Sequence, residues 1–381
     1  MEINSNPVSD FDAAVRLLSG GTNVAIYNDA GLPSIFVRRD KGAISDVVAG
    51  GPNITHYAFK VNGVEVPAFY MGKYLATVYK GYALSLPLQD PTAYSVTKEN
   101  FGPATSKYVN FDNAKLWCEA NGAGFHLPTI AEYAWLALCT ETMYSGRCFD
   151  GNNNYGINAY ANYEMGIPSY YDGERIGRTL TGSGPMSWND NGKADGICDL
   201  VGNVNEWQGG YRTVDGEIQI FPDNDAAMQT DQSETSPNWK AILQDGSLVE
   251  PGTLGTLKWD YVDGTPTNGT KGYGYRLNTA LVNQVTNDKA YGQIAFGLLK
   301  PADGIIVPDR LKMLLLMPLY DGDSIYYYDQ MVSMKNLGER LSVRGGSWSV
   351  GKIAGMFYVS ATERTVYSTK TGFRVAYIPG I

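Results

Sequence analysis

The sequence predicts an α+β fold built from short antiparallel strands, two main helices and extensive ordered loops. Glycine is abundant, at 44 of 381 residues, tyrosine reaches 27, and only 18% of the residues are charged. From residue 56 onward, short apolar stretches alternate with turns of Gly, Asn and Asp, which is the pattern of short strands joined by ordered loops. Only two segments in that part of the chain show a clear helical periodicity.

The first 55 residues differ from the rest and predict a small segment for attachment or oligomerisation. FDAAVRLLSGG favours a short helix with Asp10 as its N-cap and the Gly20–Gly21 pair as its end. NVAIYND and SIFVRRD then have the composition of short strands. Because about 55 residues are marginal for independent folding, we expect this segment to pack on the main domain, residues 56–381, or on a partner subunit.

The two clear helices are expected close together in the chain. NFDNAKLWCEANG, residues 110–122, carries apolar residues on one face, with Asn110 or Asp112 as the cap. The second helix follows HLPT, where Thr129 and Glu132 have the spacing of a capping box. Its buried stripe is expected to contain Ile130, Tyr133, Ala134, Ala137 and Leu138.

Three longer segments have no clear periodicity. Residues 144–195 and 221–275 are rich in turn-forming residues and predict ordered loop regions that decorate the same domain. Residues 305–320 are the most apolar stretch, but charged residues and two prolines interrupt it. We therefore expect a buried strand or a short helix there and no membrane span.

The charge of the chain argues against several partners. The net charge is −9 and no block of Lys and Arg is present, so the basic face that nucleic acid or an anionic membrane needs is not expected. The amino terminus lacks a basic stretch followed by an apolar one, so we expect no secretory signal and synthesis in the cytoplasm. The four cysteines form no CxxC pair and are expected to be free and buried.

The motifs of common enzyme classes are absent. A metal site with two histidines and a carboxylate would need both His56 and His126, which are the only histidines. Each is more typical of a structural histidine whose ring nitrogens form hydrogen bonds within the protein. There is no GxSxG elbow, no P-loop and no GxGxxG fingerprint. The residues therefore predict no particular catalytic chemistry.

The stretch DGICDLVGNVNEWQGG, residues 195–210, is the most informative constellation. Two carboxylates, Asp199 and Glu206, stand at opposite ends of a tight turn with backbone carbonyls between them, and calcium prefers such a set of oxygen ligands. The alternative is that both carboxylates fix the turn by hydrogen bonds while Trp207 lies in the core. The candidate ligands of a structural calcium ion are Asp199, Gly202, Val204 and Glu206.

Four landmarks occur in order along the chain: VEVPAFYMGKYLAT (64–77), HLPTIAEYAWLAL (126–138), DLVGNVNEWQ (199–208) and RGGSW…GFRVA (344–376). Together they resemble the formylglycine-generating-enzyme branch of the C-type lectin fold, and the resemblance covers about 56–381. Each motif alone is weak, but the four in this order are specific. The resemblance implies a C-type lectin fold of the formylglycine-generating-enzyme type.

The chain departs from the enzymes of that branch. Members that oxidise cysteine carry a pair of cysteines between RGGSW and GFR, and residues 347–371 contain none. Relatives that bind iron use three histidines, and this chain has two. We therefore expect no enzyme and no required cofactor. The alternatives are an enzyme of this family with a relocated site, or a purely structural virion or surface protein.

A non-catalytic branch fits better, because the last segment resembles that of diversity-generating retroelement variable proteins. There, RGGSW and GFR frame a variable region, which corresponds here to about 344–376. Reverse transcription miscopies adenines, so Asn codons of the template diversify, but Lys, Glu and Met cannot be reached from them. This excludes Lys352, Met356 and Glu363 from the expected variable positions.

The remaining residues of the segment divide into scaffold and contact positions. Glycines and apolar residues suit turns and core, and those expected to be scaffold are Gly351, Ala354, Gly355 and Phe357. Trp348 and Phe373 are expected to anchor the two ends in the core, and Arg344 and Arg374 to pair with buried carboxylates or carbonyls. The expected ligand-binding residues are Ser349, Val350, Ile353, Tyr358, Ser360, Thr362, Val366, Tyr367, Ser368 and Thr369.

The composition of the segment suits a binding surface. Ten of the 25 residues from 347 to 371 are Ser, Thr or Tyr, which supply rigid contact area and adaptable hydrogen bonds. The resemblance implies a receptor-binding protein on a phage tail or a cell surface. A protein partner is favoured over a sugar, because the calcium-sugar motifs of true lectins are missing. A homo-oligomer is compatible with the small amino-terminal segment.

Overall fold

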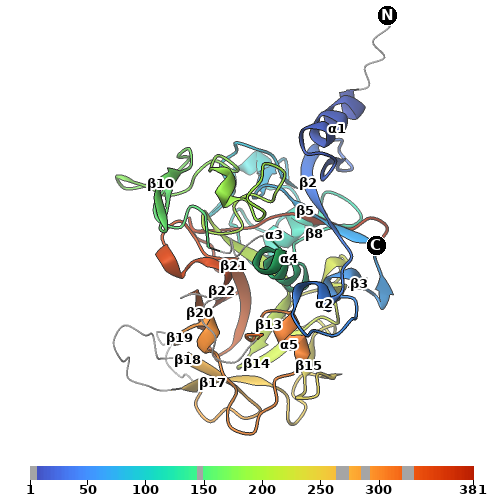
Figure 1. The fold of residues 1–381 in the computed structure, drawn as a ribbon, viewed down its shortest axis with the longest axis vertical. Coiled ribbons are helices and arrows are strands. Elements are labelled where there is room, and N and C mark those ends of the chain that lie inside the picture. Colours follow the sequence, from blue (N-terminus) through green and yellow to red (C-terminus); the bar gives the residue numbers. More distant parts are fainter. Residues whose placement is uncertain (1–6, 144–148, 263–273, 285–291, 320–329) are drawn as a thin grey trace, which may run out of the picture.

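The computed structural model describes residues 7–143, 149–262, 274–284, 292–319 and 330–381. Figure 1 shows a mixed α+β molecule in which strands far outnumber helices. The predicted α+β class is therefore confirmed. The C-type lectin type within that class stays a prediction.

Within the described residues, the larger sheet has 11 strands. They are β13 (Asn205–Val214), β14 (Glu217–Ile220), β15 (Lys240–Ile242), β16 (Leu248–Val249), β17 (Lys258–Val262), β18 (Gly274–Asn278), β19 (Gly292–Ala295), β20 (Met331–Met334), β21 (Glu339–Gly345), β22 (Gly355–Thr362) and β23 (Thr371–Gly372). The main path is β16-β15-β14-β13-β21-β22-β20-β19, and the other three strands pair off this path. The pairs β20 with β22 and β13 with β23 are parallel, and the other named pairs are antiparallel.

The smaller sheet combines the two ends of the chain. Its strands, in spatial order, are β1 (Asn23–Tyr27), β2 (Pro33–Asp40), β5 (Ala68–Gly72), β24 (Ala376–Tyr377) and β8 (Phe125–His126). All of its pairs are antiparallel. The amino-terminal segment thus supplies two strands to a sheet that it shares with the main domain, while the boundary placed at residue 55 stays a prediction.

Four two-stranded ribbons complete the described strands. They are β3 (Lys60–Val61) with β4 (Val64–Glu65), β6 (Thr77–Tyr79) with β7 (Tyr82–Leu84), β9 (Ile157–Asn158) with β10 (Ala161–Met165), and β11 (Tyr171–Asp172) with β12 (Arg175–Ile176). The predicted loop region 144–195 therefore contains small ribbons between long loops, and its residues 144–148 lie outside the described residues.

The expectation of an ordered loop region at residues 221–275 is confirmed only in part, because most of its described residues lie outside strands but several short strands interrupt them. Its described part supplies β15, β16 and β17 to the larger sheet, and Trp239 and Trp259 are buried there. These strands contain two to five residues each, which is too short for an apolar alternation to stand out in the sequence.

The helices follow the local signals of the sequence. They are α1 (Pro7–Leu18), α2 (Ile44–Val47), α3 (Phe111–Glu119), α4 (Ile130–Met143) and α5 (Asp309–Met313), with 3-10 turns η1 (Tyr57–Phe59), η2 (Lys98–Asn100), η3 (Met186–Trp188), η4 (Asp225–Ala227), η5 (Phe296–Leu298) and η6 (Gly351–Ile353). Helix α1 begins before Asp10, which lies in its first turn and is not its cap. Of the two predicted caps of α3, the Asn110 side chain is the actual one, because it accepts a hydrogen bond from the Asn113 amide at 3.0 Å, while Asp112 lies in the first turn.

The capping box of α4 is confirmed. The Glu132 amide donates to Thr129 Oγ1 at 3.1 Å, and the Thr129 amide donates to Glu132 Oε2 at 3.0 Å. Residues 130–140 are all buried, because α4 lies at the centre of the molecule (Figure 1). The expected stripe is therefore part of a helix that is buried on every side over this length.

The apolar stretch 305–320 is described up to residue 319 and contains α5, and Leu314 to Met317 behind this helix are buried, so the short-helix alternative is confirmed. No helix in the described part of the chain is long and apolar enough to cross a membrane.

Candidate ligand-binding face

The RGGSW end of the last segment is held by close packing of its glycines. Gly345 and Gly346 have φ of +84° and +82°, which a residue with a Cβ rarely adopts. A Cβ on Gly345 would lie 2.6 Å from the carbonyl oxygen of Leu200, and one on Gly346 would lie 2.7 Å from the Cβ of Ala354. Trp348 is fully buried, so this end is part of the core, as predicted.

The Arg344 side chain is also structural. Its Nη2 donates to the carbonyls of Leu314 and Leu315, which follow α5, at 3.3 and 3.1 Å. The guanidinium is almost fully buried, and burial lowers the pKa of Arg344 to about 10. The predicted pairing with backbone carbonyls is confirmed.

Arg374, in the GFR end, joins three of the four landmarks at one guanidinium. It makes a bidentate ion pair with Glu206 of the GNVNEW motif, with both N–O distances at 3.0 Å. It also donates to the carbonyl of Gly72 in the MGK motif at 2.9 Å, and to those of Cys198 and Asp199 at 2.9 and 3.3 Å. The side chains of Arg374 and Glu206 are 0% and 1% exposed. The segment is thus fastened to the core at both ends.

The candidate calcium ligands lie around this ion pair. Oδ2 of Asp199 accepts a hydrogen bond from the Gly182 amide at 2.8 Å, and burial raises the pKa of Asp199 to about 6. Both oxygens of Glu206 face Arg374. The Gly202 amide donates to the carbonyl of Gly345, and Val204 is buried.

These contacts match the alternative in which the two carboxylates fix the turn while Trp207, which is fully buried, lies in the core. No group of three or more His, Cys, Asp or Glu that could hold a metal ion occurs among the residues that the structure describes. The calcium site stays a prediction.

Beyond Trp348 the chain turns through η6, where three of the expected contact residues, Ser349, Val350 and Ile353, are half-buried. The chain before and between β9 and β10 forms hydrogen bonds with this turn. The Gly351 amide donates to the carbonyl of Asn153 at 2.7 Å, and the Tyr160 hydroxyl donates to the carbonyl of Lys352 at 2.9 Å.

Strand β22 carries Tyr358, Ser360 and Thr362 on one side, because successive side chains of a strand point to opposite faces. Ser360 and Thr362 are half-buried, but Tyr358 is only 5% exposed. The scaffold residues Ala354 and Phe357 are fully buried, as expected. Of the ten expected contact residues, Tyr358 therefore offers the least surface to a ligand.

The loop after β22 is the most outward part of the segment. Val366 and Tyr367 are 36% and 37% exposed, and Ser368 and Thr369 are half-buried. Thr365 is also exposed, although it was not among the expected contact residues. We call the surface formed by residues 349–353 and 365–369 the binding face.

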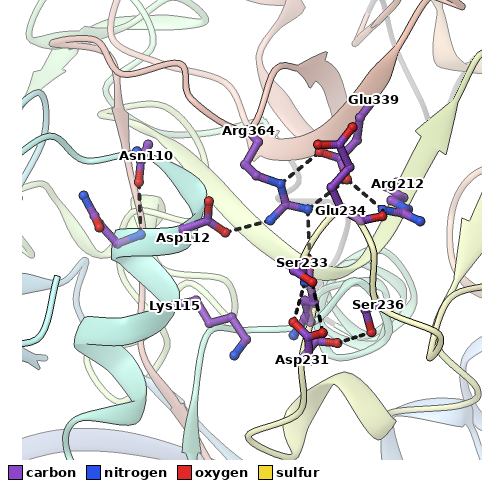
Figure 2. Close-up of polar contacts among 12 residues, drawn as sticks. Asn110, Asp112, Lys115, Arg212, Asp231, Ser233, Glu234, Ser236, Glu339 and Arg364 are labelled. Carbon is purple, nitrogen blue, oxygen red and sulfur yellow. Dashed lines mark hydrogen bonds and ion pairs between the residues drawn. The ribbon is translucent and has the colours of Figure 1, made fainter. Parts of the chain in front are cut away.

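Arg364 holds the start of this loop (Figure 2). Its Nε and Nη2 donate to the Glu339 carboxylate at 2.9 and 2.8 Å, and its Nη1 donates to Asp112 of α3 at 2.7 Å. Nη2 also donates to the carbonyl of Gln232 at 2.9 Å. The guanidinium thus ties the loop to α3, to the start of β21 and to the chain beyond β14.

Glu339 is shared with a second arginine. Arg212 Nη1 donates to Glu339 at 2.9 Å and to the carbonyl of Glu234 at 2.8 Å (Figure 2). Burial acts to raise the pKa of Glu339, but the hydrogen bonds from Arg364 and Arg212 outweigh it and hold that pKa below its ordinary value. The carboxylate is therefore charged at neutral pH and joins the two guanidiniums.

The far end of the loop is fastened through its backbone. The carbonyl of Thr369 accepts hydrogen bonds from Arg178 Nη1 at 3.1 Å and from Trp348 Nε1 at 3.3 Å. The carbonyl of Lys370 accepts from the Asn205 amide at 2.8 Å. Since Trp348 also precedes η6, it brings the two halves of the binding face together.

Two tyrosines from outside the segment pack against the loop. The ring of Tyr367 stacks on that of Tyr108, with centroids 3.9 Å apart and planes 14° apart, and Tyr94 meets both rings edge-on. Sequence reasoning missed Tyr94 and Tyr108, because they lie more than 250 residues before Tyr367 in an irregular stretch.

Comparison with known proteins gives little beyond this geometry. No protein-family model matches the chain, and no curated protein matches it. Among solved structures, Treponema denticola variable protein 1 is similar at 13% sequence identity, with 94% of this chain and 99% of that chain covered and a TM-score of 0.27. A TM-score of this size carries no argument, so the proposals below rest on the residues and contacts of this chain.

Proposed function

We propose that the chain is a variable protein of a diversity-generating retroelement, with a C-type lectin fold of the formylglycine-generating-enzyme type. Its function would be non-catalytic binding of a protein or cell-surface receptor through the binding face. The order of the four landmarks supports this proposal, and one observation carries it. The segment that resembles a variable region is fixed in the core at both ends. The exposed side chains of the segment, such as Val366 and Tyr367, lie between these two ends.

The contacts of the segment suit a surface whose side chains can change. Arg344, Trp348, Phe373 and Arg374 are at most 1% exposed, so the frame belongs to the core. Backbone carbonyls and the Arg364 side chain hold the loop that carries Val366 and Tyr367. Because exposed side chains contribute little to the core, their replacement is expected to change the surface and leave the fold intact.

The absence of catalysis is part of the proposal. Cys118, Cys139 and Cys198 are free and buried, whereas Cys148 lies outside the described residues. Burial raises the pKa of each of the three, to about 12 for Cys139 and Cys198. A buried thiol with a raised pKa is a poor nucleophile and a poor metal ligand, because both roles need the thiolate. Ligand recognition would therefore be non-covalent, with no required cofactor.

The setting of the protein is proposed from the same resemblance. Receptor recognition on a phage tail or a cell surface fits a binding face built from Ser, Thr and Tyr side chains. The amino-terminal residues 1–55 would serve attachment or assembly of copies. Receptor identity and copy number would be determined by isolating the assembled particle or surface complex.

The test is deep sequencing of the 3′ end of this gene in a natural population. We expect amino-acid differences at positions such as Val350, Val366 and Ser368, confined to bases that are adenine in a nearby template copy. Ala354, Gly355 and Phe357 should not vary. A reverse transcriptase gene should lie close by.

Two results would overturn the proposal. Identical residues at 349–369 across isolates would indicate a purely structural protein. Differences spread equally over scaffold and contact positions would indicate ordinary drift.

A further inference from the structure

We infer that Tyr94 and Tyr108 form a fixed aromatic anchor site for a protein ligand at the edge of the binding face, with the ring of Tyr367 packed on it in this chain. This inference rests on the proposed function and deepens it. It assigns part of the ligand contact to residues that lie outside the segment 344–376 and would stay constant while that segment changes.

The three rings form one cluster that reaches the surface. The Tyr94 ring lies 5.3 Å from Tyr367 and 6.0 Å from Tyr108, centroid to centroid, and its plane makes angles of 66° and 79° with those rings. Tyr94 is 44% exposed, Tyr367 is 37% exposed and Tyr108 is half-buried. Edge-to-face and offset-stacked rings hold one another in place, so the exposed parts keep a defined geometry.

The backbone beneath the two constant tyrosines is well tied. The Val109 amide donates to the carbonyl of Tyr94 at 2.9 Å, and the Val96 amide donates to the carbonyl of Lys107 at 2.9 Å. Asn110, which directly follows Val109, caps α3. Arg364 forms an ion pair with Asp112 in the first turn of the same helix (Figure 2). The tyrosine cluster and the loop of the binding face are therefore both attached to the amino-terminal end of α3.

The chemistry of the cluster favours a protein over a sugar. Tyrosine supplies a large, rigid contact area at a low cost in side-chain entropy and is enriched among the residues that dominate binding energy. Val366, on the same loop as Tyr367, adds exposed aliphatic surface. The three tyrosines, Val366 and Lys107 include no carboxylate or amide side chain, the planar groups that can bind two neighbouring hydroxyls at once.

The partner chemistry follows from these surfaces. An aliphatic or aromatic side chain that protrudes from a protein would pack on the rings. The Lys107 ammonium, 5.2 Å from the centroid of the Tyr108 ring, adds positive charge at the rim and suits an acidic residue beside that side chain.

The experiment uses defined probe proteins. The full chain is displayed with Tyr367 kept, and binders are selected separately against lysozyme and streptavidin. The randomised positions are Ser349, Val350, Ile353, Val366, Ser368 and Thr369. Tyr94→Ala, Tyr94→Phe and the control Tyr79→Ala are then introduced into each binder, and Kd is measured. Tyr79 matches Tyr94 in exposure, at 45% against 44%, and stacks on none of the three rings.

We expect Tyr94→Ala to weaken most binders of both probes by about tenfold or more, as for an interface hot spot. Tyr94→Phe and Tyr79→Ala should change Kd by less than about threefold, since the first keeps the ring and the second lies outside the cluster. Melting curves of each variant ensure that affinities are compared at equal folded fractions.

The remaining outcomes separate the two proposals. If binders arise but Tyr94→Ala costs no more than Tyr79→Ala, the anchor site is refuted while the proposed function stands. If no randomised chain binds either probe although the library folds, the proposed function fails, and the anchor site with it. If Tyr94→Ala abolishes binding to a panel of oligosaccharides and leaves protein binders unchanged, the cluster is a sugar site.

Discussion

The ion pair between Arg374 and Glu206 gives the sharpest test of how the segment 344–376 is held. Both side chains are at most 1% exposed, so solvent screening does not weaken their interaction. Glu206→Gln leaves a buried guanidinium facing a neutral amide, and removal of one partner of a buried pair costs about 3–5 kcal/mol of unfolding free energy. Arg374→Met leaves the buried carboxylate and also removes the donor from three backbone carbonyls.

The two single variants should therefore differ. Each unsatisfied buried carbonyl adds about 1 kcal/mol or more, so Arg374→Met should lose roughly 3 kcal/mol more than Glu206→Gln. The double variant removes both charges and should be less destabilised than the sum of the single effects by at least about 2 kcal/mol. Urea unfolding followed by tryptophan fluorescence measures all four species. Additive effects, or single effects below about 1 kcal/mol, would refute the buried ion pair as the fastening of the segment.

Three further predictions concern stability, loop order and pH. Gly345→Ala should lower the free energy of unfolding by at least about 2 kcal/mol. Gly351 has a φ of +72° but open space around it, so Gly351→Ala should lower the free energy by about 1 kcal/mol. Equal losses in urea unfolding would contradict the close approach of Gly345 to Leu200. Arg364→Met should speed hydrogen exchange of amides 363–369 and lower stability by about 2 kcal/mol, with exposed Arg175→Met as control; unchanged exchange would contradict the clamp. Burial lowers the pKa of His56 to about 4, so protonation of His56 in the unfolded chain should lower the free energy of unfolding by about 3 kcal/mol between pH 6.5 and 4. Asp199 has the opposite effect over this range, so the loss should be clearest in the Asp199→Asn variant. Burial raises the pKa of Asp199, so His56→Gln should leave a protein that gains stability as pH falls from 6 to 4; an unchanged pH profile in either variant would contradict these assignments.

The features that could be predicted from the sequence are local. The capping box of Thr129 and Glu132 and the cap at Asn110 involve residues three apart, so spacing alone specifies the hydrogen bonds. The strands at 23–27 and 33–40 and the buried character of Trp348 and Phe373 were likewise predicted from residue type and pattern.

The features that could not be predicted depend on distant residues. Arg374 meets Glu206 across 168 residues and Gly72 across 302, and no periodicity contains that information. Tyr94 and Tyr108 looked like ordinary loop residues until the fold placed them against Tyr367. Tyr358 was expected to contact a ligand because its residue type marks it neither as scaffold nor as unreachable, but β22 pairs with β21 on one side and β20 on the other, and Tyr358 is buried.

If the gene is diversified as proposed, the position of the last strand decides which products can fold. Strand β24 follows the binding segment and lies between β5 and β8, and Arg374 comes directly before it. A premature stop or a frameshift created within residues 349–369 would therefore remove both an inner strand of one sheet and the buried cation that joins three motifs. Such a product could not complete its fold. Under the proposed function, only diversified copies that keep the reading frame would yield a folded protein with a new surface.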